Sequence, residues 1–79
     1  MQKVRLKKRT LMKLTIDEAL RQGVTAHNSG NLQKAERVYR EILQNNPKHP
    51  DTNYYLGLIF ISTNQIEAAL RLFKTALDV

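Results

Sequence analysis

The feature of this 79-residue sequence that most constrains its fold is an internal repeat with a period of 34 residues. Shifting the sequence by that distance pairs residues of similar size and type: Gly23 with Gly57, Ala35 with Ala69, Tyr39 with Phe73, and Leu43 with Leu77. Tandem units of this length are typical of solenoid proteins, in which each unit buries its apolar face on its neighbour. We place the repeats at about 16–49 and about 50–79, within a domain over 15–79 that follows a tail over 1–14.

Each repeat reads as two helices. The apolar run YYLGLIFI over 54–61 is too short to cross a bilayer and lacks the alternation of a half-buried strand. Gly30 and Asn64, which are equivalent positions, both tolerate the left-handed conformation that ends many helices. Pro47 disfavours helix at the residue before it, and Pro50 suits a first helical turn. We therefore predict an all-α fold of helix-turn-helix units.

The pattern resembles the tetratricopeptide repeat (TPR) over residues 16–79. The residues that match the family's signature are Gly23, Ala35, Tyr39 and Pro47 in the first unit, and Leu56, Gly57, Phe60, Ala69, Phe73 and Ala76 in the second. The family's early tryptophan is replaced by Ala19 and Asn53. The resemblance implies two antiparallel helix-turn-helix units stacked as a short right-handed α-solenoid with a concave binding groove.

The resemblance also indicates where a partner would bind. First-helix positions line the concave surface in this family, and here they are Leu20, Val24, His27, Tyr54, Leu58 and Ile61. These mostly apolar positions favour a peptide or an amphipathic helix as the ligand. A further repeat or the chain's own tail could instead cover the same surface.

The sequence offers little for catalysis or for a cofactor. It has no cysteine, and His27 and His49 are isolated from each other and from any metal-ligand spacing. We expect His49, between Lys48 and Pro50, to be a solvated loop residue. The prediction is a protein without enzymatic activity, without a metal and without a cofactor.

The net charge of +6 belongs to the first 13 residues. Six lysines and arginines lie there without an acid, and from Leu14 onward seven basic residues balance seven acidic ones. The basic segment could be a solvated leader, a contact for anionic lipid or for nucleic acid, or a transit peptide. Because the repeats themselves are neutral, we expect neither nucleic acid nor a membrane to be the main partner. No secretory signal is present, so a cytoplasmic location is expected.

The last predicted helix carries more apolar residues than one neighbour can cover. They are Ile66, Leu70, Phe73 and Leu77, and no polar capping helix follows them. We therefore expect self-association through this helix or through the groove, with exchange of a helix hairpin as one route. Val79 falls two residues before the position equivalent to Pro47, which suggests the opening part of a longer bacterial TPR protein. In that case the repeats could position acceptor proteins for a glycosyl-, methyl- or sulfotransferase, which the family resemblance alone implies.

Overall fold

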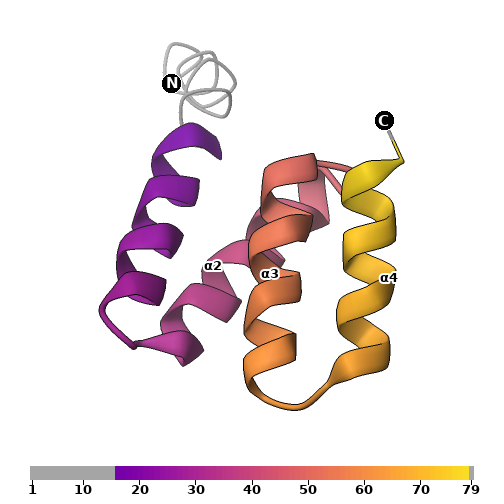
Figure 1. The fold of residues 1–79 in the computed structure, drawn as a ribbon. Coiled ribbons are helices and arrows are strands. Elements are labelled where there is room, and N and C mark those ends of the chain that lie inside the picture. The colour runs from indigo at the N-terminus through magenta and orange to yellow at the C-terminus, as the bar shows by residue number, and fades with distance from the viewer. Residues whose placement is uncertain (1–15, 79) are drawn as a thin grey trace, which may run out of the picture.

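The computed structural model describes residues 16–78, and these residues form four helices and no strand. The first helix covers residues 16–28. It is followed by α2 (Leu32–Asn45), α3 (Pro50–Ser62) and α4 (Ile66–Leu77) (Figure 1). The predicted all-α fold is confirmed. The basic tail predicted over 1–14 lies outside the described residues.

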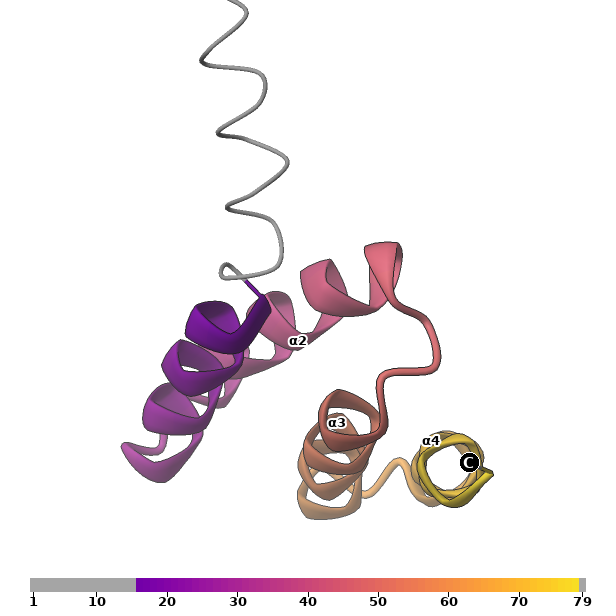
Figure 2. The same ribbon diagram turned by 90° about the horizontal axis from the view of Figure 1, so that it is seen from above.

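The helices form two antiparallel hairpins that stack side by side. The first helix pairs with α2, and α3 pairs with α4. Viewed from above in Figure 2, the first hairpin lies beside the second, and α3 occupies the position between α2 and α4. It packs against both of them, most extensively against α4. This is the short α-solenoid that the sequence predicted.

The first hairpin turns at Gly30. Gly30 has a φ of 85°, in the left-handed region where a side chain would be strained. Its N–H donates to the carbonyl oxygen of His27 at 3.0 Å, and the N–H of Asn31 donates to that of Ala26 at 2.8 Å. This pair of bonds is the Schellman arrangement that closes the end of a helix. Asn31 then caps α2, because its side-chain oxygen accepts from the N–H of Lys34 at 3.2 Å.

The second hairpin repeats the same turn at Asn64, with a φ of 65°. The N–H of Asn64 donates to the carbonyl oxygen of Ile61 at 3.1 Å, and that of Gln65 to Phe60 at 2.7 Å. Asparagine is the residue after glycine that most readily adopts this conformation. The prediction that Gly30 and Asn64 end the first helix of each unit is therefore confirmed.

Each hairpin is closed by a glycine packed under an aromatic ring. A Cβ atom added to Gly23 would lie 2.4 Å from Cε1 of Tyr39, and one added to Gly57 would lie 2.5 Å from Cε1 of Phe73. Helices approach this closely only where no side chain intervenes. The apolar core around these contacts comprises Ala26, Ala35, Tyr39, Ile42, Leu56, Ile59, Phe60 and Ala69.

The connection between the hairpins corrects one prediction. His49 is not a solvated loop residue; it is half-buried and caps α3. Its Nδ1 accepts the backbone N–H of Thr52 at 3.3 Å and lies 2.8 Å from the Thr52 hydroxyl. Asn53 occupies the family's tryptophan position, and its side-chain amide donates to the carbonyl oxygens of Pro47 at 3.0 Å and His49 at 2.9 Å. The buried amide therefore ties the connecting turn to α3.

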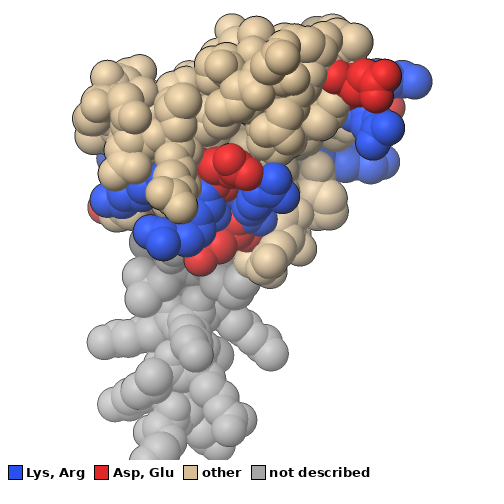
Figure 3. Space-filling view, turned by 90° about the horizontal axis from the view of Figure 1, so that it is seen from below, with Lys and Arg blue, Asp and Glu red and all other residues tan. Residues whose placement is uncertain are grey.

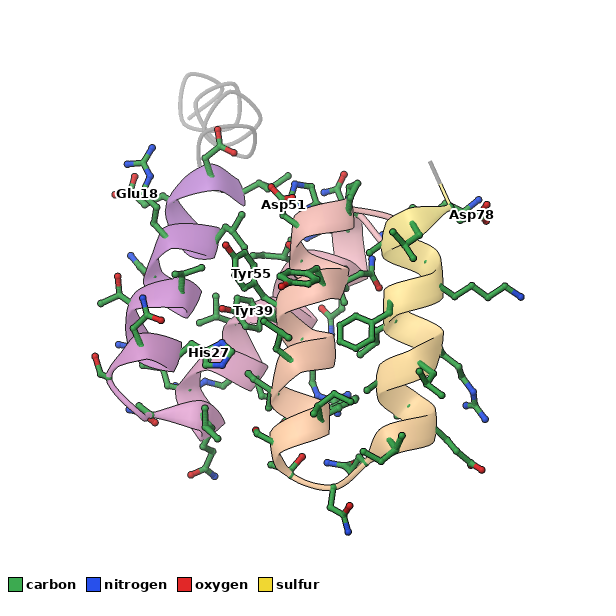
Figure 4. The ribbon with its side chains drawn as sticks, in the orientation of Figure 1. Glu18, His27, Tyr39, Asp51, Tyr55 and Asp78 are labelled. Carbon is green, nitrogen blue, oxygen red and sulfur yellow. The ribbon has the colours of Figure 1, made fainter. Side chains whose placement is uncertain are left out.

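Tyr39 joins the two hairpins. Its ring is fully buried, stacks on Tyr55 of α3 at 6.0 Å between centroids, and meets His27 edge-on at 6.4 Å. Figure 4 shows the Tyr39 and Tyr55 side chains turned toward one another between the first helix and α3. The Tyr39 hydroxyl has no hydrogen-bond partner among the described residues. Burial, with a smaller contribution from Tyr55, raises the pKa of Tyr39 from 10.0 to about 12.

The contact at Gly57 leads to a prediction about stability. Gly57→Leu should lower the free energy of unfolding by about 1–3 kcal/mol, because the new side chain must displace the Phe73 ring. Urea unfolding monitored by circular dichroism measures the change. Arg37→Leu, at an exposed position of α2, is the control and should unfold like the parent. If Gly57→Leu were equally stable, this contact would not set the packing of α3 on α4.

Tyr39 leads to a prediction about pH. Tyr39→Phe removes a buried hydroxyl that has no hydrogen-bond partner within residues 16–78, so at pH 7 the variant should be as stable as the parent or more stable, by up to about 1 kcal/mol. Because the pKa is raised on folding, the parent loses stability from about pH 10 upward, as the unfolded tyrosine ionises first. By pH 12 the parent should have lost on the order of 2–3 kcal/mol of its free energy of unfolding relative to the Tyr39→Phe variant. Urea unfolding of both proteins across this range measures it, and parallel pH profiles would contradict it.

Candidate protein-binding surface

The exposed large apolar side chains of the described residues all belong to the second hairpin. On α3, Tyr54 is 48% exposed and Ile61 42%; on α4, Ile66 is 44%, Leu70 58% and Leu77 84% exposed. α3 itself contains a single charged residue, Asp51. Figure 3 shows charged side chains gathered along one side of the molecule and a broad neighbouring surface without any. A surface of this kind usually serves in contacts with other proteins.

The predicted groove residues divide into two groups. In the first helix, Leu20, Val24 and His27 are half-buried. Leu20 packs against the core, and His27 packs edge-on against Tyr39. These three side chains are therefore partly used inside the fold.

The equivalent residues of α3 are Tyr54, Leu58 and Ile61, which we name the α3 stripe. They are more exposed to solvent. Tyr54 and Ile61 are exposed and Leu58 is half-buried. Tyr54 also reaches α4, where its ring lies 5.9 Å from that of Phe73 between centroids. The α3 stripe therefore continues onto α4 at Phe73.

The continuation on α4 is an apolar stripe that we name the α4 seam. It consists of Ile66, Leu70, Phe73 and Leu77. Leu70, Phe73 and Leu77 also line a shallow hollow of about 440 Å³, together with Lys74 and Asp78. The sequence indicated that α4 has more apolar residues than one neighbour can cover, but the hollow itself required the tertiary structure.

The internal repeat shows what covers a surface of this type. Three of the four positions on α2 that are equivalent to the α4 seam pack inward: Leu32 and Leu43 pack on the core, and Tyr39 stacks on Tyr55 of α3. The fourth position, equivalent to Leu70, is Glu36, which forms an ion pair on the surface of α2. Arg40 of α2, equivalent to Lys74, lies with its guanidinium 5.5 Å from the centre of the Phe60 ring. The surface of α2 that corresponds to the open surface of α4 is therefore covered by an apolar helix, α3.

The opposite end of the stack is polar. A hollow of about 330 Å³ on the first hairpin is lined by exposed polar residues that include Glu18, Gln22 and Thr25. Their equivalents in α3 are Thr52, Leu56 and Ile59, which are buried. The same helix face is therefore polar where it meets solvent in the first unit and buried in the second. The described stack has one polar end and one apolar end.

The described residues show no grouping of acids and histidines that could hold a metal ion. The ion pair between Glu36 and Arg40, at 2.8 Å, lies on the surface of α2 at the i, i+4 spacing that supports a helix. Within the described part of the chain, none of the helices has the length and apolar character needed to span a membrane.

The comparisons with known proteins agree with this architecture. A family model described as tetratricopeptide repeat matches residues 26–79, well over half of the chain. No curated protein and no solved structure matches the chain significantly. The match confirms the resemblance seen in the signature residues, and the stacked helix hairpins are the fold that it implies. The chain belongs to the tetratricopeptide repeat family.

Proposed function

We propose that this protein is an interaction module that binds the apolar face of an amphipathic helix or peptide along the α3 stripe. The observation that carries the proposal is the exposure of Tyr54 and Ile61 on a helix whose other faces pack against α2 and α4. The family is a general mediator of protein–protein contacts, which supports the class of partner. An extended apolar stripe fits helix-in-groove recognition, in which apolar residues repeat every three or four positions of the ligand.

The polar surroundings of the stripe favour a ligand with a basic or neutral polar face. Asp17 is exposed in the first helix, and Asp51 is exposed in the first turn of α3. The Asp51 carboxylate also stabilises the N-terminal end of α3. The half-buried residues Leu20, Val24 and His27 would extend the contact across the first helix.

We further propose that the protein acts through binding alone, as members of this family typically do. A second copy of the chain is one such partner, and the α4 seam is the surface that supports this form of binding. The cytoplasmic location expected from the sequence stays a prediction.

Charge introduced into the α3 stripe tests the proposal. The probe is a fluorescein-labelled synthetic helix with leucines at i, i+3, i+4 and i+7 and with lysine and glutamine elsewhere. Ile61→Asp should weaken its binding about tenfold or more, because an anchor of an apolar contact commonly contributes over 1 kcal/mol. Fluorescence anisotropy measures the affinity.

Gln44→Asp, at an exposed position of α2, is the matched control and should bind as the parent does. Circular dichroism checks that each variant remains folded. Equal affinity of Ile61→Asp and parent for the probe, or no binding by the parent, would contradict the proposed function.

A further inference from the structure

The α4 seam has the spacing of a coiled-coil contact. Ile66, Leu70, Phe73 and Leu77 follow one another at intervals of four, three and four residues. At about 100° per residue they lie within about 60° of one another around the helix. A narrow stripe with this alternation is the seam by which one helix packs on another with knobs in holes. It is mainly solvent-exposed, with Leu77 84% and Leu70 58% accessible.

The two flanks of the seam differ in chemistry. On one side, about 70–90° from the seam, are Ala69 and Ala76. Ala69 is fully buried and Ala76 half-buried, because this side of α4 packs on α3. On the other side, at a similar angle, are Glu67 and Lys74, which are both exposed. The open flank therefore carries one negative and one positive charge, seven residues apart.

This charge pattern selects one orientation for a second copy. In an antiparallel pair related by a two-fold axis, the open flanks of both helices lie on the same side of the contact. Glu67 of each copy then lies about 3 Å along the axis from Lys74 of the other, within reach of their long side chains. In a parallel pair each open flank would instead face the alanine flank of the other copy, on which α3 is packed. Only the antiparallel pair places opposite charges together, twice.

We infer that two copies of this chain associate through their α4 seams as an antiparallel pair, with the two-fold axis passing between Leu70 and Phe73. Ile66 of each copy packs on Leu77 of the other, and Leu70 packs on Phe73. This two-fold contact is isologous, so a single surface patch serves both copies and no open chain of subunits forms. The inference rests on one part of the proposed function, that the protein acts by binding other proteins, and it names a second copy as the partner of the α4 seam.

The same geometry links the seam to the α3 stripe. Because α3 packs on the alanine flank of α4, the two-fold axis brings the α3 helices of both copies to one side of the pair. Tyr54, which contacts Phe73 at the edge of the seam, then lies near the subunit boundary. The pair therefore buries the seam directly and shields part of the α3 stripe, which adds apolar area to the contact.

Sedimentation equilibrium of the 79-residue chain and its charge variants tests the inference. The parent should associate to a dimer, and Leu70→Asp, at an exposed position, should weaken association by about tenfold or more. Glu67→Lys and Lys74→Glu should each weaken it about tenfold, since two attractive pairs become repulsive. Arg71→Glu, which also changes a charge on α4 but lies beyond the flank, should change the dissociation constant by less than about twofold.

The decisive measurement is sedimentation equilibrium of the two charge variants in combination. An equimolar mixture of Glu67→Lys and Lys74→Glu chains should form a heterodimer about as tight as the parent dimer, and the double variant should form a homodimer. A monomeric parent at about 100 μM, single variants that dimerise like the parent, or charge swaps that fail to restore association would each overturn the inference.

The probe helix separates this inference from the proposed function. Leu70→Asp should weaken dimerisation by about tenfold or more, while the chain still binds the labelled amphipathic probe at the α3 stripe. If the parent is monomeric but binds the probe, and Leu70→Asp loses that binding, the seam belongs to the ligand site and the dimer is overturned while the proposed function stands. If the parent dimerises as described but does not bind the probe, the α3 stripe proposal fails and the dimer stands.

Discussion

The structure depends on one contact that occurs twice, a glycine of one helix packed under an aromatic ring of the next. Gly23 lies under Tyr39, and Gly57 lies under Phe73. The missing side chain allows two helix axes to approach, and the ring fills the space beside them, as close-packed interiors require. This contact sets how each hairpin closes. It also determines which face of α2 meets α3 and which face of α4 is left for a further helix.

The two copies of this contact have different surroundings, and the difference shapes the molecule. The ring of Tyr39 is enclosed, because Tyr55 of α3 stacks on it. The ring of Phe73 lies over Gly57 and beside Tyr54, and it remains half-exposed. A solenoid unit buries its apolar surface on its neighbours, and within the described residues the second unit has a neighbour on one side only. The face left open among these residues is the α4 seam. At the other end of the described stack, exposed polar residues line the first helix.

Function in such a protein follows from which apolar surfaces stay open. α3 is apolar almost all round, and α2 and α4 cover two of its faces. The third face carries Tyr54 and Ile61 and merges with the α4 seam through Phe73. In the proposed function this continuous surface holds an apolar helix, and in the proposed dimer its flanking charges, Glu67 and Lys74, select the orientation of that helix. Complementary charges beside an apolar contact commonly act on specificity in this way.

The sequence by itself determined the period, the helical class and the helix ends, because these depend on local chemistry. Gly30 and Asn64 end helices through their own backbone preferences, and the apolar spacing marks which side of each helix is buried. Periodicity, however, gives an angle around a helix and not what packs there. Only the tertiary structure showed that His49 caps α3, and that Asn53 replaces the family's tryptophan by anchoring a turn. The tertiary structure also showed that two equivalent positions have different environments. Leu20 packs inward on the core, and Tyr54 remains exposed beside α4.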